Sequence, residues 1–126
     1  MREPESRWLV AEIGLFQPDV IITTHAPHGI VDFDGPPEGP SQVGSLGQKL
    51  LGTFPGSLGN FAGQQRDLPV VTVELSSARS MPEREDIESM WANLQDRLLE
   101  RFPEPKKASL LSRRHYSHFF EVESKF

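Results

Sequence analysis

Hydrophobic residues recur at helical spacing in two parts of the chain. Residues 4–16 place four apolar side chains near one face before Pro18 interrupts the pattern. They are Trp8, Leu9, Ile13 and Phe16. Residues 83–101 carry a longer apolar stripe that follows an acidic first turn. It consists of Ile87, Met90, Trp91, Leu94, Leu98 and Leu99. We predict an amphipathic helix over each range.

Two short runs are apolar at successive positions instead. Val20, Ile21 and Ile22 form the first run, which continues into two threonines, and residues 69–75 form the second. Unbroken apolar runs of this length are typical of buried strands in parallel sheets. The two runs therefore predict two buried strands, which we expect to be parallel.

The region between the two runs is rich in proline and glycine. Residues 26–40 read as a long loop, and residues 41–51 as a helix with Leu46, Leu50 and Leu51 facing inward. Ser57 is placed to cap a short helix that extends to about Gln65. The order helix, strand, helices, strand, helix is typical of the α/β class.

Composition narrows the class of protein further. A chain of 126 residues with 37% hydrophobic residues suits one globular domain. The net charge of -5 argues against a nucleic-acid binder, and the absence of cysteine excludes disulfides, thiolate metal sites and cysteine nucleophiles. No run is long enough to span a membrane, and the polar N-terminus does not resemble a signal peptide, so a cytoplasmic location is the expectation.

The last part of the chain differs in composition from the rest. Residues 104–126 contain two lysine or arginine pairs together with several aromatic residues, and they show no clear period. We treat residues 1–103 as the domain and residues 104–126 as a basic and aromatic tail of unknown role.

Two polar residues, one directly after the first apolar run and one inside the second, are candidates for a catalytic or ligand-binding role. His25 directly follows the first run, at the carboxyl end of a strand, where α/β proteins place ligands. There it can ligate a metal, act as a base, or simply hydrogen-bond within a turn. Glu74 lies inside the second run, where a buried carboxylate needs a partner or a function. Either it reaches a cleft as a general base, or it pairs with a structural arginine such as Arg66 or Arg79.

The loop after the first run adds further potential metal ligands. His28, Asp32 and Asp34 follow His25 within nine residues. This spacing matches no established zinc pattern, and such residues are also common in turns. One alternative interpretation is nevertheless a small metal-binding protein that uses His25, His28, Asp32 and Asp34 as ligands.

Two blocks of the sequence resemble zinc carboxypeptidases of the carboxypeptidase A type. PDVIITTHAPHG at residues 18–29 and DFDGP at 32–36 resemble the region of the third zinc ligand. FPGSLGNFAG at residues 54–63 and LPVVTVEL at 68–75 resemble the region of the catalytic glutamate. The bacterial murein-peptide amidase branch is the most similar, and the resemblance covers about residues 3–101.

The resemblance implies a fold, a cofactor and roles for four residues. The fold would be part of a three-layer α/β domain with a mixed sheet, parallel central strands and flanking helices. His25 would be one of three protein ligands of a catalytic zinc, and Glu74 the general base that takes a proton from the zinc-bound water. Gly56 and Ser57 would border the pocket for a peptide substrate, such as a cell-wall peptide. The bond before Pro27 would be cis.

The sequence also departs from the family pattern. The family's other two zinc ligands come from a His-x-x-Glu motif upstream, and no such motif precedes His25. The upstream arginines that bind the substrate are missing as well. The chain therefore resembles the C-terminal half of such a domain, incomplete and inactive alone. A sheet that lacks the strands of the N-terminal half would expose a strand edge and favour self-association. The alternative is a non-catalytic fragment or interaction module that retains the fold.

Overall fold

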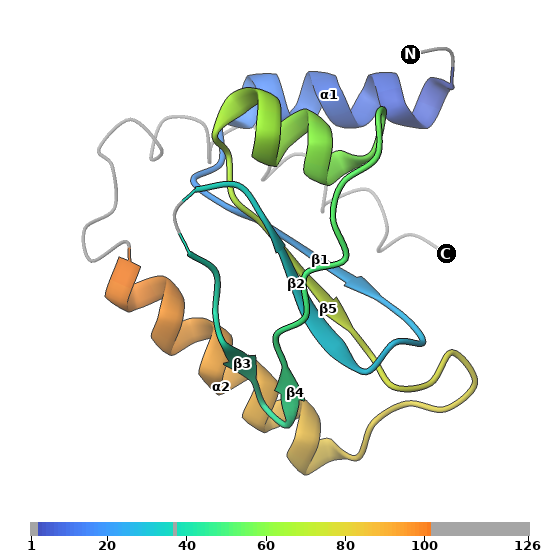
Figure 1. Ribbon diagram of the computed structural model, residues 1–126, viewed down its shortest axis with the longest axis vertical. Helices are drawn as coiled ribbons and strands as arrows, with labels where there is room; N and C mark the ends of the chain where they lie inside the picture. Colours follow the sequence, from blue (N-terminus) through green and yellow to red (C-terminus); the bar gives the residue numbers. More distant parts are fainter. Residues whose placement is uncertain (1–2, 37, 102–126) are drawn as a thin grey trace, which may run out of the picture.

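The computed structural model describes residues 3–36 and 38–101 and shows helices packed on a small sheet (Figure 1). Eight elements follow one another in these described residues. They are α1 (Pro4–Phe16), β1 (Ile21–His25), β2 (Ile30–Asp34), β3 (Gln42–Val43), β4 (Leu46–Gly47), η1 (Gly59–Gln64, a π-helix), β5 (Val70–Glu74) and α2 (Arg84–Arg101). The predicted helices at both ends of this region and the predicted strands at both apolar runs are confirmed.

The main sheet is mixed and has the strand order β1-β5-β2. β1 runs parallel to β5, with Ile21 opposite Val70 and His25 opposite Glu74. β2 runs antiparallel to β5 on its other side, with Ile30 also opposite Glu74. The chain is thus of the α/β class with a mixed sheet, and the expected parallel pairing of the two apolar strands is confirmed.

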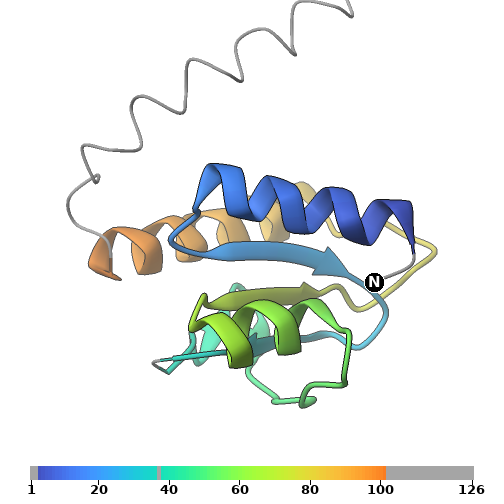
Figure 2. The same cartoon turned by 90° about the horizontal axis from the view of Figure 1, so that it is seen from above.

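The two faces of the sheet are covered by different elements. Val71 and Val73 of β5 point to the face covered by α2 and the β3–β4 hairpin, where the main core lies. That core also contains Val31, Val43, Leu46, Met90 and Leu94. The opposite face is covered by η1, which packs on β2 and β5. Figure 2 shows η1 and α2 on opposite sides of the sheet.

Two predictions for the proline- and glycine-rich region are wrong. Residues 26–40 are not one long loop, because β2 lies within them and supplies a full edge of the sheet. Residues 41–51 are not a helix but contain the β3–β4 hairpin. Gly44 turns this hairpin with a positive φ of 59°, a conformation that glycine adopts without steric cost and that a helix interior does not provide. The hairpin buries Val43 and Leu46 against α2.

Much of the predicted apolar surface remains exposed. The described residues of α1 include no buried side chain, and Trp8 is 63% exposed. β1, predicted as a buried strand, lies at the edge of the sheet, and its Ile22 is 36% exposed. On α2 only Met90 and Leu94 are buried. Among the described helices, none has both the length and the apolar composition needed to span a membrane.

The free edge of β1 has a defined set of outward backbone groups. The N–H of Ile21 donates to the Pro69 carbonyl at 2.9 Å, and the carbonyl of His25 accepts from the Leu75 N–H at 2.8 Å. Because alternate residues of a strand direct these groups to the same side, those of Ile22 and Thr24 point away from β5. β1 carries no lysine, proline or bulge that would block pairing at this edge.

We expect the chain to self-associate through this edge. Thr24→Pro removes an outward N–H without removing a bond to β5, so it should shift the chain to monomer. Thr24→Val keeps the N–H and should associate like the parent. Sedimentation velocity over a range of concentrations measures this. A monomeric parent, or equal association of the two variants, would contradict the expectation.

Candidate active site

His25 and Glu74 meet at the carboxyl ends of the two parallel strands. They are directly opposite each other in the register of β1 and β5. The imidazole Nδ1 lies 3.7 Å from Glu74 Oε1, which is longer than a hydrogen bond and attractive only when the imidazole is protonated. The His25 side chain is 60% exposed, whereas that of Glu74 is only 7% exposed. The pair thus joins a solvent-facing imidazole to a buried carboxylate.

The turn after β1 fixes this pairing. The chain passes from β1 to β2 across the end of β5, and Gly29 donates its N–H to the Leu75 carbonyl at 3.3 Å. Gly29 has a positive φ of 66°, and a Cβ here would lie 3.1 Å from Ser76 Oγ, so glycine suits this position. The bond between Ala26 and Pro27 is cis, as the resemblance implied.

The environment of Glu74 leaves one carboxylate oxygen without a partner. Oε2 is fully buried and accepts no hydrogen bond from the described residues. Neither of the arginines considered from the sequence pairs with Glu74 among the described residues. Arg66 stacks on the Phe61 ring at 3.8 Å, and no described ion pair joins Arg79 to Glu74. A buried carboxylate with an open oxygen is costly for stability, which is common for groups retained for function.

The other candidate metal ligands do not join His25. The described part of the chain contains no group of three or more histidine, aspartate or glutamate side chains arranged to hold a metal. Asp32 is buried and has a structural role, because its Oδ1 accepts the N–H of Phe33 at 2.9 Å and that of Leu51 at 3.0 Å. His28 is exposed in the turn between β1 and β2.

Asp34 lies in a contact that the sequence analysis missed. A Cβ on Gly59 would overlap the Asp34 carboxylate, and one on Gly63 would lie 2.8 Å from the Asp34 Cβ. Two glycines four residues apart therefore let η1 approach β2 closely, and this spacing was the available signal. Burial and, secondarily, the charge of Asp32 raise the pKa of Asp34.

Gly56 and Ser57 lie at the start of η1. The Ser57 hydroxyl accepts the N–H of Asn60 at 3.1 Å, so the predicted cap is present. Both residues line a hollow of about 230 Å³ between α1 and η1. The lining of this hollow includes neither His25 nor Glu74, and the substrate-binding role of Gly56 and Ser57 stays a prediction.

A second motif was missed in the sequence. His118 and Glu121 form a His-x-x-Glu near the end of the chain, after the strands rather than before His25. In the family that the chain resembles, this motif precedes the third zinc ligand, so a His-x-x-Glu after Glu74 does not follow the family order. Both residues, like the whole 104–126 tail, lie outside the described residues.

No family model, curated protein or solved structure matches this chain. Function is therefore inferred from the geometry of His25 and Glu74 and from the motifs that surround them.

The raised pKa of Asp34 gives a prediction for stability. The folded state binds the Asp34 proton more tightly than the unfolded chain, so this stabilising contribution is present at low pH and is lost as pH rises through the raised pKa. Asp34→Asn removes the ionisation. Relative to the parent, its free energy of unfolding should rise between about pH 3 and pH 6, as measured by urea unfolding. The exposed Asp96→Asn is the control, and an unchanged difference across this range would contradict the assignment.

The open oxygen of Glu74 gives a second prediction. Glu74→Gln keeps the shape but removes a buried charge, so it should raise the free energy of unfolding at neutral pH by about 1 kcal/mol. Glu88→Gln, at an exposed carboxylate on α2, should change it by less than about 0.5 kcal/mol. A loss of stability in Glu74→Gln would indicate that the carboxylate serves to hold the fold.

Proposed function

We propose that this chain is the part of a zinc carboxypeptidase-type peptide or amide hydrolase that carries His25 and Glu74. One observation supports the proposal most. Glu74 Oε2 is buried without a hydrogen-bond partner among the described residues, and it lies beside His25 at the carboxyl ends of parallel strands. Ligands in open α/β sheets bind at this edge. The mixed sheet with helices on both faces also suits the three-layer fold that the motifs imply.

The two residues suit different tasks. Glu74 Oε2 is buried and has no competing donor among the described residues, so a water admitted beside it could transfer a proton to this oxygen, which would then pass it to a leaving amine. His25 exposes its imidazole to solvent, as a group that binds an incoming ligand must. The register of β1 and β5 keeps both groups side by side without help from other side chains.

The described residues do not by themselves fit a catalytic zinc. Such a centre takes three protein ligands, and here the described residues offer one histidine without a second ligand grouped around it. In our proposal the other two ligands come from polypeptide outside the described residues. The peptide substrate, of the cell-wall class in our proposal, would be bound only once those parts are joined.

A non-catalytic interaction module is the second candidate. The exposed apolar side chains favour it, since Trp8, Leu15 and Phe54 are each more than 60% exposed. Large exposed apolar surface marks places where other polypeptides bind. The two candidates differ in whether His25 has a role toward metal.

Zinc binding by the full chain separates the candidates. We expect weak binding of Zn²⁺ that His25→Ala abolishes and His28→Ala leaves unchanged, because only His25 lies beside Glu74. Calorimetric titration and elemental analysis after dialysis measure it. His118→Ala is included because His118 and Glu121 are the one His-x-x-Glu in the sequence.

Each outcome has a distinct meaning. Equal losses in His25→Ala and His28→Ala would favour the small metal-binding protein instead. Loss in His118→Ala as well as His25→Ala would assign the missing ligands to the tail. Absence of any His25-dependent binding would contradict the zinc proposal and favour the interaction module.

A further inference from the structure

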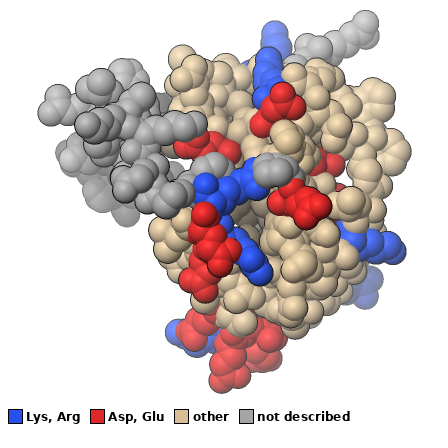
Figure 3. Space-filling view, turned by 60° about the vertical axis from the view of Figure 1, so that its left-hand side comes forward, with Lys and Arg blue, Asp and Glu red and all other residues tan. Residues whose placement is uncertain are grey.

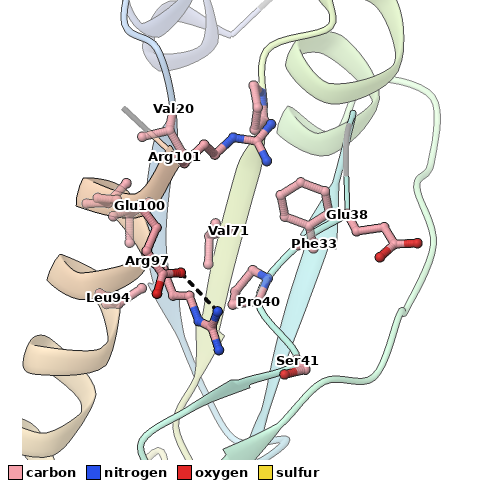
Figure 4. Close-up of a pocket in the computed structure, with 14 residues that line it drawn as sticks. Val20, Phe33, Glu38, Pro40, Ser41, Val71, Leu94, Arg97, Glu100 and Arg101 are labelled. Atoms are coloured by element: carbon pink, nitrogen blue, oxygen red, sulfur yellow. Dashed lines mark hydrogen bonds and ion pairs between the residues drawn. The ribbon is translucent and has the colours of Figure 1, made fainter. Parts of the chain in front are cut away.

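A groove lies between α2 and the sheet, on the face opposite His25 and Glu74. Its volume is about 400 Å³, within the range of pockets that hold ligands. Its floor is apolar and consists of Val20, Ile22, Phe33, Val71, Leu94 and Leu98. Figure 4 shows α2 on one side of this floor and the segment around Pro40 on the other. Ile22 at the floor is 36% exposed, so the groove leaves apolar surface in contact with water.

The rim of the groove is charged, but its cations have partners. Arg97 pairs with Glu100 at 3.1 Å, and Arg101 donates to the Pro36 carbonyl at 3.0 Å. Figure 3 shows acidic and basic side chains next to each other around a hollow on this side of the molecule. The rim thus lacks a single-sign patch that would select a charged small molecule. What the groove mainly offers is apolar surface.

The chain itself leaves the described part at this rim. Arg101, the last residue of α2, lines the groove, and 25 residues follow it. Pro103 and Pro105 follow, and proline is unfavourable in a helix interior. Residues 106–111 then present two lysines followed by Leu110 and Leu111. Leu110 lies nine residues after Arg101, a stretch that spans up to about 30 Å when extended, so the leucines can reach the groove.

Charge also favours contact between this segment and the rest of the chain. Residues 102–126 hold five of the 13 lysines and arginines and three of the 18 acidic residues, so they carry a net +2. The remaining residues then carry a net -7. The groove rim includes Glu38, for which the described residues provide no ion pair. Lys106 and Lys107 are within reach of it.

We propose that the chain covers this groove with its own residues 106–111. Leu110 and Leu111 fill the apolar floor, and the lysine pair lies over the acidic part of the rim. The tail thereby shields Ile22 and Leu98 from water and closes the α2 face. This role is independent of the His25 and Glu74 face and holds whether or not the chain is part of a hydrolase.

Limited trypsin digestion of the full chain tests the proposal. Cleavage after Lys107 falls inside the docked segment, and cleavage after Arg114 falls outside it. Relative to a free peptide of residues 102–126, cleavage after Lys107 should be slowed at least tenfold more than cleavage after Arg114. Equal slowing at both positions would overturn the proposal.

Two adjacent leucines provide a matched pair of variants. Leu98 lines the groove, whereas Leu99 does not and is 66% exposed. Leu98→Glu should abolish the selective protection of Lys107, and Leu99→Glu should leave it within twofold of the parent. Circular dichroism checks the fold of both. If Leu98→Glu unfolds the chain, Leu110→Glu combined with Leu111→Glu makes the same test from the tail side. Protection that survives this double substitution would overturn the proposal.

A disulfide test identifies the occupant. The chain has no cysteine, so Ser41→Cys at the rim combined with Ser109→Cys in the tail gives one defined pair. Mild oxidation should link them within one chain, and Ser80→Cys with Ser109→Cys should link at least tenfold less. Linked dimers as the main product would show that a second copy, rather than the chain's own tail, occupies the groove.

Discussion

The pairing of β5 between β1 and β2 is the interaction on which the rest of the structure depends. β5 is the only described strand with a partner on both sides, and its alternating side chains serve two purposes. Val71 and Val73 point to α2 and form the core, while Glu74 points to the other face and meets His25. Because the side-chain period of a strand is two, a register shift by one residue would turn Val71 and Val73 to the η1 face and move the carboxylate into the core beside α2.

The sequence was sufficient where a pattern was long or unbroken. The α2 stripe keeps helical spacing over 18 residues, and the β1 and β5 runs are short, unbroken and rich in β-branched residues, which favours strands. β2 was missed because its alternation, in IVDFD, is short and lies among prolines and glycines that indicate a loop. The β3–β4 hairpin has only two residues per strand, and Leu46 in it fits a helical spacing with Leu50 and Leu51 that follow it. Its structure follows from packing on α2, which local sequence does not encode.

The same distinction applies to the candidate site. The sequence singled out His25 and Glu74 separately, and the register of β1 and β5 places them opposite each other. The sequence did not reveal that Asp32 Oδ1 accepts two backbone N–H groups, because one of them belongs to Leu51, 19 residues away. Nor did it reveal the contact of Asp34 with η1, which depends on the glycines of a helix that covers the sheet. Long-range contacts of this kind decide which carboxylates remain available.

Among the described residues, the β1 edge, the surroundings of His25 and the groove beside α2 each leave groups exposed that could contact other polypeptide. The chemistry of the contact differs between them. The β1 edge offers a row of backbone hydrogen-bonding groups, which matches another strand. A zinc ion at His25, as we propose, would need further ligands on the same face of the sheet. The groove beside α2 needs only apolar side chains. A tail that leaves from the end of α2 starts at the groove, on the face opposite His25. In our proposals the chain's own tail covers the groove, whereas the β1 edge and the zinc ligands beside His25 require other polypeptide.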